Sequence, residues 1–84
     1  MKLYLISQSV NSGYDTYDSA VVIADSEEEA RMVHPEKDPR WNGVKNHLFD
    51  SWADAKDVQV VYLGEAEEGL EDYGPVICSS FNAG

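Results

Sequence analysis

The chain has 84 residues, of which 43% are hydrophobic and 11% aromatic, and its 16 acidic and 6 basic residues give a formal net charge of −10. This length suits a single domain, residues 1–84, with one or two layers of secondary structure, and the aromatic content distinguishes it from a disordered acidic tail. The charge argues against direct binding to nucleic acid or to an anionic membrane and favours a basic partner, although acidity also promotes solubility.

The single cysteine, Cys78, excludes an intramolecular disulfide and suits a reducing compartment. The apolar run at residues 3–6 is too short for a signal peptide or a membrane span. We therefore expect a cytoplasmic protein.

Alternating side chains over residues 3–9 predict a strand, and the nearly continuous apolar run at residues 3–6 favours a central position in a sheet, covered at least partly on both faces. A turn signal at Asn11-Ser12-Gly13 separates this strand from a second extended segment at residues 14–24. The two segments are expected to form an antiparallel hairpin.

A helix is predicted to begin at Ser26, because Ser26 and Glu29 fit a capping box and the first turn is acidic. Pro35 is expected to end this helix after roughly two turns, since the residue before a proline is biased away from helical conformation. That residue, His34, would then complement the dipole at the helix C-terminus.

Residues 35–56 are predicted mainly as loop. Trp41 and Trp52 are expected to cover the edge of the core, and a short helix is allowed around Leu48, Phe49 and Trp52.

Two further strands are predicted, at residues 57–63 and 76–81, with an acidic loop at residues 65–72 and a turn at Gly74-Pro75 between them. The resulting order is strand, strand, helix, strand, strand. We therefore expect an α+β fold in which an antiparallel four-stranded sheet carries one short helix on a face.

Two acidic clusters are candidate partner-binding groups. The first cluster holds four acids in five residues and the second holds five acids in eight: Asp25, Glu27, Glu28 and Glu29, then Glu65, Glu67, Glu68, Glu71 and Asp72. Their carboxylates could replace backbone phosphates, because arginine and lysine side chains that hold phosphate also bind carboxylate. Alternatively, the first cluster complements a helix dipole and the second is a solvated loop.

Secondary interface candidates lie in the region of the second strand: Asp15, Asp18, Tyr14 and Tyr17. The two tyrosines could anchor a protein partner, or they could form ordinary cross-strand pairs.

Metal binding and catalysis are not indicated by any spacing in the sequence. Neither acidic cluster has the pattern of an EF-hand loop, and His34, His47 and Cys78 lack zinc-site spacing. Cys78 lies in an apolar strand, where a cysteine is typically a small buried hydrophobe. We expect a protein that is not an enzyme and uses no cofactor or metal.

Four phrases together resemble a group of small proteins of bacteriophages and prophage-bearing bacteria. They are GYDTYDSAVV at residues 13–22, DSEEEAR at 25–31 leading to His34-Pro35, YLGEA at 62–66 and the terminal SSFNAG at 79–84. The resemblance spans nearly the whole chain and carries no catalytic motif.

Small acidic phage proteins include anti-CRISPR proteins, some of which act as DNA mimics. By this analogy, the chain would inhibit a type I CRISPR system inside the host bacterial cell, by blocking DNA or PAM recognition on a basic surface such as that of a Cascade large subunit. The alternative is a phage accessory or regulatory module that binds protein through an apolar patch or an exposed strand edge. A homodimer is compatible with either function.

Overall fold

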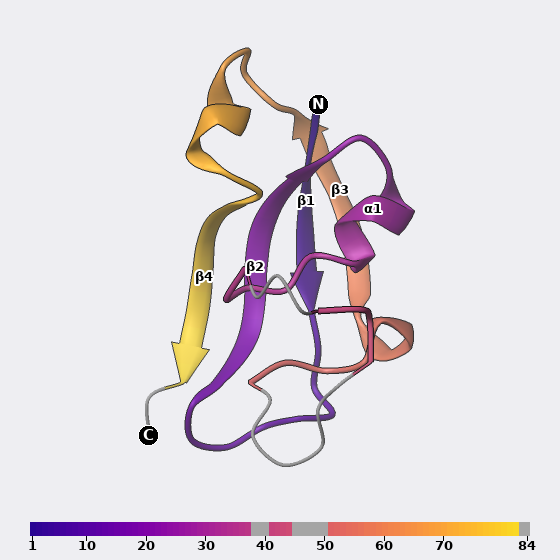
Figure 1. Cartoon of the computed structure of the whole chain (residues 1–84), viewed down its shortest axis with the longest axis vertical. Coiled ribbons are helices and arrows are strands. Elements are labelled where there is room, and N and C mark those ends of the chain that lie inside the picture. Colours follow the sequence, from indigo (N-terminus) through magenta and orange to yellow (C-terminus); the bar gives the residue numbers. More distant parts are fainter. Residues whose placement is uncertain (38–40, 45–50, 83–84) are drawn as a thin grey trace.

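Four antiparallel strands form one sheet in the order β3-β1-β2-β4 (Figure 1), in a computed structural model that describes residues 1–37, 41–44 and 51–82. The strands are β1 (Lys2–Ser7), β2 (Thr16–Ala24), β3 (Gln59–Glu65) and β4 (Val76–Asn82). This confirms the prediction of a small α+β fold with a four-stranded antiparallel sheet and one short helix.

The α-helix, α1 (Glu27–Arg31), lies between β2 and β3 in the sequence. Two 3₁₀ helices that the sequence patterns did not predict precede the last two strands: η1 (Ala55–Asp57) comes before β3, and η2 (Leu70–Tyr73) lies within the segment predicted as an acidic loop. These short helices arise where the chain must turn into an edge strand.

The hairpin of β1 and β2 forms the centre of the sheet, as predicted. Its loop is held by the buried side chain of Gln8, whose Nε2 donates to the carbonyl oxygens of Asn11 at 2.8 Å and Tyr17 at 2.7 Å. The Gln8 Oε1 accepts from the Asn11 backbone N–H at 2.8 Å. The side-chain amide thus satisfies backbone groups that a loop would otherwise leave without a partner.

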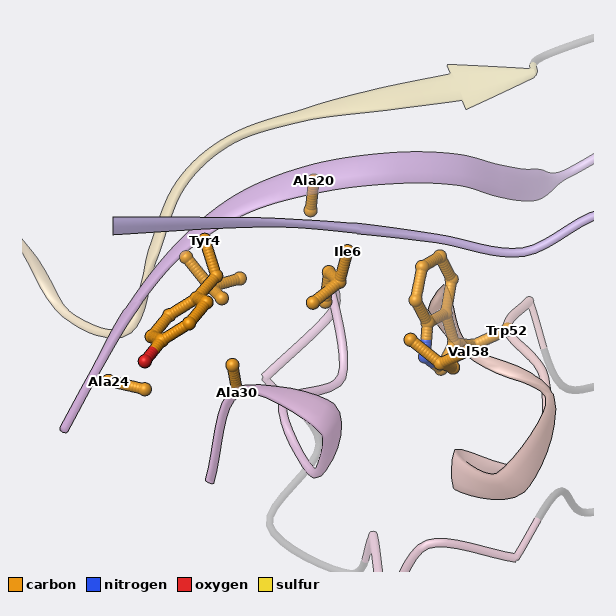
Figure 2. Packing of buried hydrophobic residues seen from close by; sticks show 8 residues of the cluster. Tyr4, Ile6, Ala20, Ala24, Ala30, Trp52 and Val58 are labelled. Atoms are coloured by element: carbon orange, nitrogen blue, oxygen red, sulfur yellow. The ribbon is translucent and has the colours of Figure 1, made fainter. Parts of the chain in front are cut away.

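The core lies on one face of the sheet (Figure 2). Tyr4 and Ile6 of β1 alternate with outward-facing residues and pack with Val22 of β2 against Ala30 of α1. Trp52 is fully buried and completes this cluster, and Trp41 packs against it while partly buried. Both tryptophans therefore contribute to the core, as predicted.

Helix α1 begins as predicted but ends earlier. Ser26 is the N-cap, and its Oγ accepts from the Glu29 N–H at 3.2 Å. The helix has only five residues and ends at Arg31, because the N–H of Met32 bonds to the Glu29 carbonyl three residues back and the chain tightens out of the α-helix. Pro35 is therefore not the residue that ends it.

His34 was predicted at the helix C-terminus, and that position is wrong. The residue lies beyond α1 and is 4% exposed, with its ring 5.0 Å from that of Trp41 in an edge-on contact. Its Nδ1 accepts from the Glu36 N–H at 3.0 Å. His34 therefore belongs to the packing beneath the sheet and has no role in capping the helix.

The short helix allowed around Leu48, Phe49 and Trp52 lies mostly outside the described residues. Trp52 itself is in a bend rather than a helix. Hydrogen bonds to backbone carbonyls fix its segment: the Tyr17 N–H donates to the Ser51 carbonyl at 2.9 Å, and the Asn11 side-chain Nδ2 donates to the Trp52 carbonyl at 2.8 Å.

The other face of the sheet carries an uncharged row that crosses all four strands. In β3-β1-β2-β4 order the row is Val61, Leu5, Val21 and Cys78, which are neighbours in the strand registers. Val61 is 51% exposed and Cys78 is also exposed, while Leu5 and Val21 are half-buried. The expected cover on both faces of the central strand is therefore only partial, and Cys78 is not the buried hydrophobe that its apolar context predicts.

Candidate functional site

Both acidic clusters lie at the same end of the sheet. Lys2 at the start of β1 pairs with Ala24, the last residue of β2, and with Glu65, the last residue of β3. Neighbouring strands are about 4.8 Å apart, so the points where the two clusters begin are separated by roughly 10 Å. The antiparallel topology thus joins two segments forty residues apart in the sequence into one acidic end.

The acidic end is defined by nine carboxylates, all of them exposed: Asp25, Glu27, Glu28, Glu29, Glu65, Glu67, Glu68, Glu71 and Asp72. They are nine of the sixteen acidic residues of the chain. Arg31 Nη2 lies 3.5 Å from Glu27 Oε1, and the Tyr62 hydroxyl donates to Glu65 Oε2 at 2.6 Å. The other seven carboxylates make no ion pair or side-chain hydrogen bond with the described part of the chain.

A shallow pocket of about 230 Å³ connects the two clusters. Its lining includes Glu29 from the first cluster and Glu71 from the second, with Met1, Ile23, Gly74 and Pro75. The two carboxylates therefore border one concave surface. Because the Debye length is about 10 Å at 0.1 M salt, charges this close act on an approaching group together.

Three cationic side chains lie near the acidic end: Lys2, Arg31 and Lys37, whose ammonium lies beside Gly74 of the pocket lining. The guanidinium of Arg31 donates to the carbonyls of Ala55 and Val58, which ties α1 to the segment before β3. The half-buried Lys2 lies between the two clusters in the strand register. The acidic end therefore keeps a large excess of negative charge.

The secondary interface candidates lie at the opposite end of the sheet. Thr16 at the start of β2 pairs with Asn82 at the end of β4, so the loop that carries Tyr14 and Asp15 is a full strand length away from the acidic end. Asp18 is the extra residue of a bulge in β2 and is exposed. The structure does not bring these residues together with the acidic clusters.

Tyr14 and Tyr17 differ in their surroundings. Tyr14 is 78% exposed and remains accessible, whereas Tyr17 packs against the core and its ring centroid is 4.7 Å from that of Phe81 on β4. Tyr17 thus makes the ordinary cross-strand pair that was the alternative to an interface role.

Burial, and secondarily the charge of Glu36, raises the pKa of Tyr17 above its usual value of 10.0. The neutral phenol is favoured in the folded state, so its contribution to stability is complete below pH 10 and is lost as the pH rises through the folded-state pKa. In a tyrosinate absorbance titration, the difference between wild type and Tyr17→Phe should have its midpoint above pH 10. The same difference in a Glu36→Gln background should have a lower midpoint, and an unchanged one would contradict the effect of Glu36.

Residues 1–37, 41–44 and 51–82 contain neither a metal-binding cluster nor a membrane-spanning helix. Within these residues no group of three or more histidine, cysteine, aspartate or glutamate side chains is arranged to hold a metal ion. Over the same ranges, no helix is both long and apolar enough to cross a membrane. His47 lies outside the described residues.

The convergence of the two clusters was not visible in the sequence. Each cluster is obvious as a run of acids, but their proximity depends on β1 pairing with both β2 and β3, which are distant from each other in the chain. The continuous apolar run at residues 3–6 did indicate that β1 would be central. This was the one feature of the sequence from which the proximity of the two clusters could have been inferred.

Comparison of the chain with protein-family models, with curated proteins and with solved structures gives no match.

Proposed function

We propose that this protein is an inhibitor that binds the basic, nucleic-acid-binding surface of another protein, with the acidic end taking the place of backbone phosphates. The observation that supports the proposal most is the meeting of the two clusters at one end of the sheet, with nine exposed carboxylates. The protein acts by occupying the surface and catalyses no reaction.

Seven of these carboxylates have no partner within the described residues, so binding does not require existing ion pairs to be broken. Each carboxylate can accept two hydrogen bonds from an arginine of the partner, which is the geometry that arginine also uses with phosphate. On binding, both proteins release counterions and form ion pairs with each other. The complex is therefore held mainly by electrostatic attraction.

The resemblance to bacteriophage proteins favours a particular partner. A Cascade-type effector of a type I CRISPR system must hold duplex DNA on a basic surface in order to read the PAM, and a phosphate mimic would block that step. The protein would then act as an anti-CRISPR inhibitor in the cytoplasm of the host bacterial cell. The resemblance, rather than the geometry, selects this partner.

The test is a binding measurement on purified Cascade-type effector. Labelled protein is titrated with the effector at salt concentrations from about 50 to 200 mM, and competition with target duplex is measured at the lowest salt. We expect the dissociation constant to rise by at least about tenfold over this range, because exposed charge pairs are screened by salt. Failure of the folded protein to displace duplex at the lowest salt would contradict the proposal for this effector.

A protein-interaction module remains a second candidate, favoured by the exposed apolar residues on the open face of the sheet. Val61 on this face is 51% exposed, and Leu63, the extra residue of the bulge in the same strand, is also 51% exposed. In the same titration, a Val61→Ser/Leu63→Ser variant should bind like wild type if the acidic end makes the contact. A large loss of affinity in that variant, with little salt dependence, would favour the second candidate instead.

A further inference from the structure

Strand β4 is an edge strand whose outer side is unoccupied in the described part of the chain. It pairs only with β2 and is the outermost strand of the sheet (Figure 1). All its residues after Val76 are exposed, including Ile77 at 36% and Phe81 at 44%. Its outward backbone N–H and C=O groups therefore face solvent and can pair with another strand.

Over residues 78–82 the edge lacks the features with which proteins usually discourage such pairing. Residues Val76–Asn82 contain no charged residue and no proline, in a chain of which 26% is charged. Ile77, near the start of β4, is an extra residue relative to β2. From Cys78 to Asn82 β4 contains no extra residue, because the second bulge of this pair lies in β2 at Asp18. Five consecutive residues thus present a regular, uncharged edge.

The other edge strand, β3, is less suitable. Leu63 is an extra residue relative to β1 and interrupts the register, and the next residue, Gly64, has a φ of 150°. The strand is flanked by Asp57 and ends at Glu65, so charge lies at both of its ends. Bulges and flanking charges of this kind disfavour strand addition. The Ile77 bulge lies near the start of β4 and leaves five consecutive residues regular, whereas β3 has charge at both ends and a bulge after Tyr62, so the two edges are not equivalent.

The uncharged edge suits a second copy of itself, and the distribution of charge determines the direction of pairing. β4 begins at the acidic end, where Val76 pairs with Val22. In a parallel pair of two copies the acidic ends would be adjacent, whereas antiparallel pairing places them at opposite ends of the strand. A seven-residue strand spans roughly 23 Å, which is more than twice the Debye length of about 8 Å at physiological salt. A second copy can therefore pair antiparallel without bringing the two acidic ends together.

We propose that β4 pairs antiparallel with β4 of a second copy across a two-fold axis, which joins the two sheets into one of eight strands. The contact is isologous, so the same uncharged residues are used by both copies. It is small compared with a standard interface, and we expect a dissociation constant between about 10 µM and 1 mM. This inference stands independently of the proposed function.

The test is sedimentation equilibrium over the range from about 1 µM to 2 mM. The mass of the wild type should rise from 9.4 kDa toward twice that value. Ser80→Lys places a charge on the paired edge and should weaken dimerisation at least about tenfold, even though it lowers the net negative charge. Gln59→Lys adds the same charge to the exposed edge of β3 and should dimerise like wild type. The proposal would be overturned if the wild type stayed monomeric over the whole concentration range. It would also be overturned if Gln59→Lys weakened dimerisation and Ser80→Lys did not.

Salt and a spin label provide two further measurements. The dissociation constant of the dimer should fall as salt rises, because screening reduces the repulsion between two chains of charge −10. Binding to a basic partner has the opposite salt dependence, so failure of one proposal is distinguishable from failure of the other. Nitroxides on Cys78 should show dipolar coupling that disappears on dilution, and coupling absent at 2 mM would contradict the antiparallel pair.

Discussion

A Trp52→Ala variant is expected to lose about 3–5 kcal/mol of unfolding free energy. Trp52 has no exposed surface and is the largest of the fully buried side chains, in one cluster with Ile6 and Val58 (Figure 2). Its removal leaves a cavity that a small core cannot refill. A domain of this length has a total stability of roughly 4–13 kcal/mol, so the variant will be close to unfolded at the lower limit.

Urea denaturation followed by far-ultraviolet circular dichroism measures this loss without relying on tryptophan fluorescence. Tyr73→Ala is the matched control, because Tyr73 is 75% exposed and its truncation should change stability by less than about 0.5 kcal/mol. If Trp52→Ala does not fold, Trp52→Phe should give a smaller, measurable loss in the same direction. A loss below about 1 kcal/mol in Trp52→Ala would show that the cluster is not the principal core.

Charge reversal at the acidic end should have the largest effect on binding. We expect Glu67→Lys/Glu68→Lys to weaken binding to the basic partner by about 100-fold and to reduce its salt dependence, because two attractive charges become repulsive. Both residues are exposed, and their side chains make no ion pair or hydrogen bond within the described residues, so the fold should be retained. The measurement is the salt-dependent titration of the effector, with circular dichroism to verify folding.

The matched control reverses the same amount of charge elsewhere. Asp18→Lys/Glu36→Lys changes the net charge equally, and both residues are exposed and lie outside the two clusters. This control should weaken binding less than about fivefold, through the overall field alone. Equal losses in the two double variants would mean that net charge, rather than the acidic end, determines binding, and phosphate mimicry would then be rejected.

The elements that sequence patterns predicted well are those set by local physics. The Ser26 cap, the alternation in β1 and the extended segment of β3 are determined by residues within a few positions of each other, and each is present in the structure. The central position of β1 was also predicted from its own residues, because a nearly continuous apolar run favours a strand that is at least partly covered on both faces.

The errors have non-local causes. His34 was assigned to the helix C-terminus because Pro35 follows it, but the ring of Trp41 provides an apolar site that removes it from solvent. Cys78 was expected to be buried because its strand neighbours are apolar, but one short helix covers only one face of the sheet. The acidic end itself requires pairing across more than forty residues, and no local pattern contains that information.

The strand order also has a consequence for how the chain folds. Only the β1–β2 hairpin joins strands that are close in sequence, whereas β3 and β4 must each return over long stretches of chain to reach their partners. Long loops must therefore close before most of the sheet is formed, which slows folding relative to helical domains of similar size. During synthesis, the β1–β2 hairpin emerges before β3 and β4 with both of its edges unpaired, and β2 gains its outer neighbour only after residues 76–82 have left the ribosome. Until β4 pairs with β2, the nascent chain is exposed to incorrect strand pairing.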